Sequence, residues 1–231
     1  MAASLRTTHP HLKLTLSFDN GPDAAVTPRV LDVLARHRVQ AHFYVLGQRL
    51  ADEAGRELVR REVGEGHLVG NHSYSHQVPL GDDPRPDAVF EEIEKTEALL
   101  EPLAPGERRF RPFGGGGLLG PHLLSPRAVE HLCRRAYTCV LWNSVPRDWV
   151  DPGGWAAVAL AGLEANAHTV MVLHDIPGAC LDGLDGFLCA ARELGASFVV
   201  DLPATCVPIE QGRVVGDLRP LVREAAARVI A

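Results

Sequence analysis

The stretch LTLSFDNGPD, residues 14–23, decides how the chain is interpreted. Apolar and polar side chains alternate from Leu14 to Phe18, which predicts a β-strand, and this strand ends at Asp19-Asn20 before a glycine and a proline. An Asn-Gly pair by itself favours a hairpin turn. The next segment, TPRVLDVLARH (27–37), has a helical pattern instead. The stretch therefore indicates a β-α unit with an acid at the carboxyl end of its strand.

The same alternation continues along the chain. Strand-like segments lie at 12–18, 41–47, 67–73, 108–114, 137–143, 169–175 and 197–202. Helical patterns lie at 27–37, 50–66, 86–103, 125–135, 154–166 and 181–195, with a C-terminal helix expected over Pro220 to Ala231. Continuous alternation predicts a parallel sheet covered by helices, which an open doubly wound sheet or a (β/α) barrel would satisfy. Seven or eight units without a phosphate-binding glycine loop favour the barrel, so we expect one α/β domain over 1–231 with its motifs within about 12–203.

Composition narrows the class of protein. The chain has 231 residues, 46% of them hydrophobic, and a net charge of −6, which suits one large domain with a full core. Basic residues are scattered among acids, as in EEIEKTE (91–97), so no nucleic-acid surface is expected. The longest strongly apolar run, WAAVALAGL (155–163), is too short to span a bilayer, and no membrane partner is expected.

Cysteine usage and the N-terminus bear on the compartment. The five cysteines show no CxxC spacing, and we interpret them as reduced thiols of the core. The segment MAASLRTTHPHLKL (1–14) lacks the apolar stretch of a secretory signal. We therefore predict a cytoplasmic protein, although a shortened piece of a secreted protein would look the same.

Reactive side chains recur at the ends of the predicted strands. Asp19 closes the first strand, His72 the third, Arg111 the fourth and His174 the sixth, and Asp148 lies just beyond the fifth. In a parallel barrel these positions share one rim, where such folds keep their active sites. Each residue alone has an ordinary structural explanation, such as a capped turn or a core histidine. Their shared placement is what predicts a site.

Two histidines suggest a metal. In GNHSYSHQ (70–77), His72 and His76 stand four residues apart, so a loop or one helical turn can aim both imidazoles at one point. Neutral imidazoles suit Zn²⁺ and related metals. The pattern also arises by chance in a chain with 11 histidines, but its position after a strand in a Gly/Asn/Ser-rich loop favours a metal site. The glycine run after Arg111 lacks the GK[ST] sequel of a phosphate loop, and its backbone N–H groups could approach an oxyanion.

Taken in order, these segments resemble the polysaccharide deacetylase family, carbohydrate esterase family 4. The segments that carry the resemblance are SFDNGP (17–22), HSYSH (72–76), FRPFG (110–114), RDW (147–149) and VLHD (172–175). The family shows (T/S)FDDGP, H(S/T)xxH, R-P-x, DW and L-x-H in the same order. The resemblance implies an irregular (β/α) barrel and metal-dependent removal of N-acetyl groups from a carbohydrate.

The resemblance also implies roles for single residues. Asp19 would be the general base that deprotonates a metal-bound water, with Arg111 holding it ionised, and His174 would protonate the departing amine, with Asp148 orienting it. The metal, usually zinc, cobalt or nickel in this family, would be bound by His72 and His76, and Asn20 stands at the position of the third ligand. The backbone N–H near Gly114 would bind the oxyanion, and Trp149 and Leu173 would wall the pocket for the acetyl methyl group.

Two positions depart from the family pattern: Asn20 replaces an aspartate that normally completes the metal triad, and Gly114 replaces a tyrosine. An amide oxygen coordinates without negative charge, so metal should bind more weakly. The metal could be held by His72, His76 and Asn20 with waters, Asp19 could enter the shell, or the site could be inactive. We expect the first, because the other catalytic positions are intact. Besides the carbohydrate deacetylase, hydrolysis of a small amide or cyclic imide and a glycan-binding pseudoenzyme remain alternatives.

Overall fold

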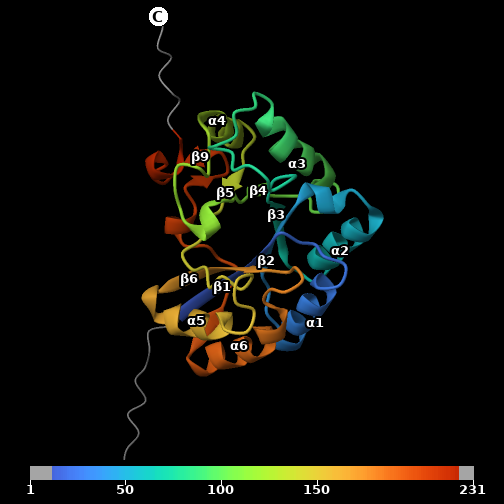
Figure 1. Ribbon diagram of the computed structural model, residues 1–231, viewed down its shortest axis with the longest axis vertical. Helices are drawn as coiled ribbons and strands as arrows, with labels where there is room; N and C mark the ends of the chain where they lie inside the picture. Colours follow the sequence, from blue (N-terminus) through green and yellow to red (C-terminus); the bar gives the residue numbers. More distant parts are fainter. Residues whose placement is uncertain (1–11, 224–231) are drawn as a thin grey trace, which may run out of the picture.

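The computed structural model describes residues 12–223 and places the strands at the centre of the molecule, with helices around them (Figure 1). The parallel strands are β1 (Leu12–Asp19), β2 (His42–Val45), β3 (Leu68–Asn71), β4 (Arg109–Phe110), β5 (Thr138–Cys139), β6 (His168–His174) and β7 (Ala196–Phe198). The helices are α1 (Thr27–His37), α2 (Glu53–Gly64), α3 (Lys95–Leu100), α4 (Pro126–Arg134), α5 (Trp155–Gly162) and α6 (Leu181–Glu193). A π-helical turn, η2 (Phe90–Glu94), leads into α3, and short 3-10 turns are η1 (Gly47–Leu50), η3 (Gly115–Gly117), η4 (Leu163–Ala165), η5 (Ala204–Cys206) and η6 (Arg219–Leu221).

The sheet curls into an irregular barrel. Its strand order is β6-β1-β2-β3-β4-β5, and a parallel bridge between Ser144 and Met171 joins the segment after β5 back to β6. β7 lies beside the first residues of β1, at Leu12 to Leu14, whereas β2 pairs with β1 only from Ser17 onward. The predicted irregular (β/α) barrel in a single α/β domain is confirmed.

The alternation in β1 separates the core from the site. Leu12, Leu14, Leu16 and Phe18 belong to the hydrophobic cluster that includes side chains of α1 and α6. Successive side chains of a strand point to opposite faces, so Ser17 and Asp19 face the barrel interior. Because β1 and its parallel neighbours end at one rim, the polar residues at their carboxyl ends are brought together there.

Several predicted elements differ from the structure. β4 and β5 have two residues each instead of seven, and Pro112, which has no N–H for the ladder, follows soon after β4. The region 86–103, expected to be one helix, contains the π-helical turn before α3. The hairpin of β8 (Ile209–Glu210) and β9 (Arg213–Val214) was not predicted.

The prediction of a C-terminal helix over Pro220 to Ala231 is wrong for the described part of this segment, which has a 3-10 turn followed by an extended residue, Val222. Residues 224–231 lie outside the described chain. All five cysteines are free thiols, but Cys189 is exposed on α6 and so is not the core residue that we expected. None of the helices between residues 12 and 223 combines the length and apolar character needed to cross a bilayer.

Candidate active site

A buried ion pair lies at the end of β1. Asp19 is 4% exposed, and Nη1 of the fully buried Arg111 donates hydrogen bonds to Asp19 Oδ1 at 3.0 Å and to Ser17 Oγ at 2.5 Å. The guanidinium also lies 4.0 Å from the centre of the Tyr44 ring. Burial acts to raise the pKa of Asp19, but the positive charge of Arg111, together with His72, His174 and the hydrogen bond from Arg111, outweighs burial, and the pKa is lowered. Asp19 is therefore an ionised carboxylate at neutral pH.

A second pair lies on the adjacent strand. Asp148 Oδ1 contacts His174 Nδ1 at 2.8 Å, and Asp148 Oδ2 accepts the backbone N–H of His174 at 2.8 Å. Burial alone would lower the pKa of His174, but the hydrogen bond and charge of Asp148 raise it. Since Nδ1 is occupied by the carboxylate, Nε2 is the nitrogen left to meet a ligand. His174 and Asp19 are register partners on β6 and β1, so the two pairs stand side by side.

The two histidines of the 70–77 loop meet at the same place. His72 Nδ1 lies 2.8 Å from the carbonyl oxygen of Arg111, which can only accept, so Nδ1 carries the proton. His72 Nε2 is then free of hydrogen and lies 3.6 Å from Asp19 Oδ2. The rings of His72 and His76 are 5.1 Å apart between centroids, and the His76 ring stacks on Phe113 at 3.9 Å. Burial lowers the pKa of His72 and brings that of His76 to about 3, so both stay in the neutral form that binds metals.

Asn20 brings an amide oxygen to this group. Its backbone is left-handed, with φ of 76°, and its N–H donates to the carbonyl of Tyr44 at 3.2 Å. Its Oδ1 is buried and has no hydrogen-bond partner among the described residues. A buried oxygen without a partner is costly in free energy unless something absent from the protein chain satisfies it. Together with the neutral imidazoles of His72 and His76, this oxygen forms a donor set that fits a divalent cation.

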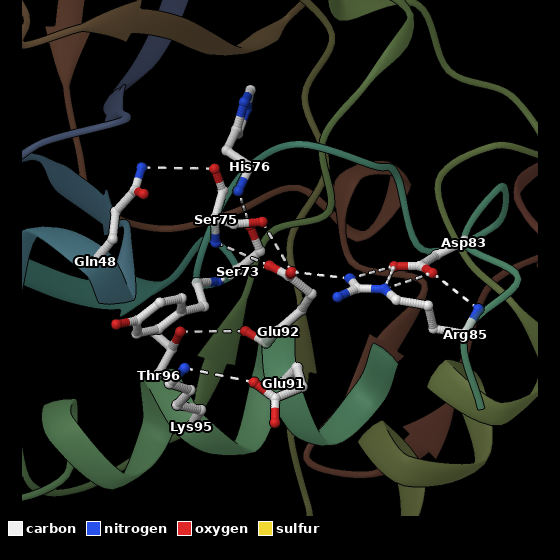
Figure 2. Close-up of polar contacts among 11 residues, drawn as sticks. Gln48, Ser73, Ser75, His76, Asp83, Arg85, Glu91, Glu92, Lys95 and Thr96 are labelled. Atoms are coloured by element: carbon white, nitrogen blue, oxygen red, sulfur yellow. Dashed lines mark hydrogen bonds and ion pairs between the residues drawn. The ribbon is translucent and has the colours of Figure 1, made fainter. Parts of the chain in front are cut away.

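A buried glutamate holds the backbone of the histidine loop. Glu92, in the π-helical turn, accepts hydrogen bonds through Oε2 from the N–H groups of Tyr74 (3.1 Å) and Ser75 (2.8 Å). Its Oε1 accepts from Ser75 Oγ at 2.8 Å and from Arg85 Nη2 at 3.1 Å. In Figure 2 the side chain of His76 points away from Glu92, so the glutamate contacts the loop and not the imidazole. The loop backbone is left-handed at His76, with φ of 55°, and these bonds fix that conformation.

One cavity of about 310 Å³ connects these groups. It is lined by Asp19, Asn20, His72, His76 and His174, and by Pro112, Phe113, Gly114, Gly116, Gly117, Trp142, Val145, Trp149, Val172 and Ile176. The predicted site residues Gly114 and Trp149 are thus at the cavity. Arg111 and Asp148 lie behind it, through their contacts with Asp19 and His174.

Leu173 is not placed where we expected it. It is fully buried in the cluster that contains Phe18 and Leu184, whereas its neighbour Val172 lines the cavity. The reason is the alternation along β6, in which Val172 and His174 share the face opposite to Leu173. Gly114 also has a steric reason to remain glycine, because an added Cβ would lie 2.7 Å from the ring of His122.

Sequence reasoning missed three contributors: Ser17, Phe113 and Glu92. Ser17 precedes Asp19 by two residues and so shares its face of β1, a relation that the strand pattern already contained. Phe113 follows Arg111 by two residues within the FRPFG segment. No comparable signal marks Glu92, because it is one of four glutamates in the segment 91–97 and only the fold buries it.

The α/β barrel places a paired carboxylate, a paired imidazole and two further imidazoles around one cavity at its rim. These are the kinds of group that a hydrolase uses. The sequence profile described as polysaccharide deacetylase matches residues 6–117. A chitooligosaccharide deacetylase of Rhizobium leguminosarum bv. phaseoli is 35% identical over 165 residues, 70% of this chain and 67% of the relative. A peptidoglycan-N-acetylglucosamine deacetylase of Bacillus cereus is 31% identical over 199 residues, 81% of this chain and 66% of the relative.

A solved structure agrees with these relatives. The family 4 acetyl xylan esterase from Clostridium thermocellum, in complex with a cobalt ion, superposes with a TM-score of 0.66 at 30% identity, over 80% of this chain and 86% of that one. The chain belongs to the polysaccharide deacetylase family, which confirms the resemblance drawn from its motifs.

Proposed function

We propose that the protein is a metal-dependent hydrolase that cleaves the N-acyl amide of an acylated amino sugar. The observation that carries this proposal is the register pairing of Asp19 with His174, each bound to a partner of opposite charge, at the wall of one cavity. Amide hydrolysis requires a base for the attacking water and an acid for the amine leaving group. Two adjacent groups can supply both, because the pKa of the Asp19 carboxyl is lowered and the pKa of the His174 imidazole is raised.

The cation would be held by His72, His76 and Asn20, which together offer two neutral imidazole nitrogens and one unpartnered amide oxygen. When bound, a divalent ion such as zinc, cobalt or nickel supplies Lewis acidity for the carbonyl oxygen and the attacking water. The complex of the acetyl xylan esterase with cobalt supports this choice of cofactor.

The chain's own residues would manage the protons. Asp19 accepts a proton from the attacking water, and Arg111 keeps the carboxylate ionised until then. His174 donates a proton to the departing amine nitrogen, and Asp148 stabilises the imidazolium that performs this step. Gly114 lines the cavity, and the backbone N–H groups near it would bind the oxyanion.

The test is acetate release from chitin oligomers by protein that has been stripped with a chelator and then reloaded with zinc or cobalt. We expect activity only after reloading, and a loss of about 10²- to 10⁴-fold in kcat for His174→Ala. His168→Ala is the matched control, because this histidine lies at the opposite end of β6 and contacts Thr15 Oγ1 at 2.9 Å. Undiminished turnover in His174→Ala would remove the assigned acid. Binding of the oligomer without release under any metal would instead favour the glycan-binding pseudoenzyme.

A further inference from the structure

The cavity wall contains few polar side chains. All five of its polar lining side chains belong to the groups assigned above to catalysis or metal binding, namely Asp19, Asn20, His72, His76 and His174. The other lining residues are glycines, a proline and large apolar residues. Of the two lining tryptophans, Trp142 already donates its indole N–H to the carbonyl of Gly117 at 2.7 Å. No carboxylate, amide or cationic side chain among the described lining residues remains to bind sugar hydroxyls.

Such a wall favours an apolar ligand group. Hydroxyls that lose water against apolar side chains without new hydrogen bonds are penalised, whereas each buried methylene improves binding by about fourfold. Val145, Val172 and Ile176 offer aliphatic contacts, and Trp142 and Trp149 offer aromatic ones. Apart from the amide that reacts, the cavity therefore favours a hydrocarbon group on the substrate.

One glycine of the run borders open space, whereas a Cβ added at Gly114, Gly115 or Gly117 would lie 2.7 to 2.8 Å from a side chain. A Cβ added at Gly116 would meet no other atom within 4 Å. The cavity of about 310 Å³ is about ten times the volume of one liquid water, ~30 Å³. Two exposed apolar residues, Leu118 (72% exposed) and Val150 (59% exposed), directly follow the lining residues Gly117 and Trp149 in the sequence.

We propose that the acyl group removed by this protein is larger than acetyl: an unbranched chain of four or more carbons on a sugar amine. This inference rests on the function proposed above and names its substrate class. The reaction stays a simple hydrolysis, in which the amide C–N bond breaks, the water oxygen joins the acyl carbon, and the products are a fatty carboxylate and an ammonium group. No oxidant, reductant or further reactant is required.

The first experiment measures kcat/KM of the metal-loaded protein on N-acetyl-, N-butanoyl- and N-hexanoyl-glucosamine. We expect kcat/KM to rise with each methylene by up to about fourfold. A series in which acetyl is best overturns the substrate class and leaves the proposed function standing. If none of the three is hydrolysed, the proposed function fails on these sugars, and the inference is then decided by calorimetric binding of acetate, butanoate and hexanoate to the metal-free protein. Affinity that does not increase with chain length overturns it.

A variant that narrows the cavity provides the second experiment. Val145→Phe places a ring beside the glycine run, since a Cβ at Gly117 would already lie 2.8 Å from Val145 Cγ1. We expect the hexanoyl-to-acetyl ratio of kcat/KM to fall by about tenfold or more, as for the loss of two or more buried methylenes. Val158→Phe, on the exposed face of α5, is the matched control. An unchanged ratio in a folded Val145→Phe variant, checked by circular dichroism, overturns the inference; Ile176→Phe replaces it if that variant does not fold.

Discussion

Asn20 determines the charge of the candidate metal site. With two neutral histidines and a neutral amide, the proposed ligands contribute no negative charge of their own, and the nearest carboxylate, Asp19, is already paired with Arg111. Asn20→Asp adds an anion at a position whose side-chain oxygen is buried and unpartnered. We expect zinc to bind at least about tenfold more tightly, a gain of about 1.4 kcal/mol or more. Competition with a chromophoric chelator measures this affinity.

The control for this change is Asn166→Asp, which adds the same charge after the η4 turn. If both variants bind zinc like the unaltered protein, Asn20 lies outside the metal shell. Asp19 would then be the ligand to examine, since its Oδ2 already lies 3.6 Å from His72 Nε2.

The His174–Asp148 pair predicts a pH dependence of activity. Burial lowers and the Asp148 charge raises the pKa of His174, with a net increase above its usual value near 6.5. A raised pKa keeps the acid protonated to higher pH, so activity is lost only as pH rises through that raised value. In Asp148→Asn the pKa of His174 should fall, because burial is then opposed only by the weaker contributions of Asp19 and Asp175. We expect the alkaline limb of the kcat/KM profile to move to lower pH.

The comparison for this profile is Asp151→Asn, which neutralises an exposed acid three residues further along. An alkaline limb at the same pH in Asp148→Asn and in the unaltered protein would show that His174 is not the titrating acid. A lower kcat with no change in the limb would be expected of a purely structural contact, so the position of the limb separates the two roles.

At the scale of elements, the π-helical turn is tied to the histidine loop through Glu92. Both of its carboxylate oxygens bind that loop or Arg85, and the residue is 3% exposed. Glu92→Ala should weaken zinc binding by about ten- to a hundredfold, because groups that orient metal ligands have effects of this size. Glu92→Gln should weaken zinc binding less than Glu92→Ala does, since one oxygen is kept as an acceptor. Zinc titration and the thermal unfolding midpoint are the measurements.

Glu91→Ala is the matched control, because Glu91 lies in the same turn but reaches outward to Lys95 at 3.4 Å (Figure 2). Zinc affinity that drops equally in both variants would mean that the turn is merely loosened. An unaltered affinity in Glu92→Ala would show that the loop holds His76 without this carboxylate.

The sequence pattern predicted those helices and strands whose limits depend on neighbouring residues. The helix predicted at 27–37 matches α1, Thr27–His37, whose proline stands at the start where its missing N–H costs nothing. The β8–β9 hairpin was missed although Gln211-Gly212, both with positive φ, forms its turn. The lengths of β4 and β5 were overestimated, because a strand ends where its neighbour stops pairing and the sequence does not contain that information.

For the molecule as a whole, the sequence predicted the rim but not the order of strands around it. Parallel strands place their carboxyl ends together, so Asp19, His72 and His174 could be grouped without any coordinates. The closure through Ser144 and Met171 and the position of β7 beside β1 depend on long-range packing and could not be predicted.

Arg111 connects the site to the stability of the barrel. From the end of β4 it reaches Asp19 on β1, and its other nitrogens donate to the carbonyls of Val140 (3.4 Å) and Leu141 (3.3 Å) after β5. Arg111→Leu leaves the Asp19 carboxylate buried without its cation, and breaking such a pair costs about 3–5 kcal/mol of unfolding free energy. Replacing both partners, as in Arg111→Leu with Asp19→Asn, should cost less than the sum of the single changes, because no charge is then left uncompensated.

Urea denaturation of the four proteins in this cycle measures the coupling, and Arg60→Leu is its control. Arg60 pairs with Glu53 and Glu57 on the surface of α2, where such pairs contribute about 0–1 kcal/mol. A cost for Arg111→Leu no greater than that of Arg60→Leu would mean that the barrel does not depend on the ion pair. A large cost that is partly recovered in the double variant would show that the buried pair of Arg111 and Asp19 contributes to the stability of the barrel.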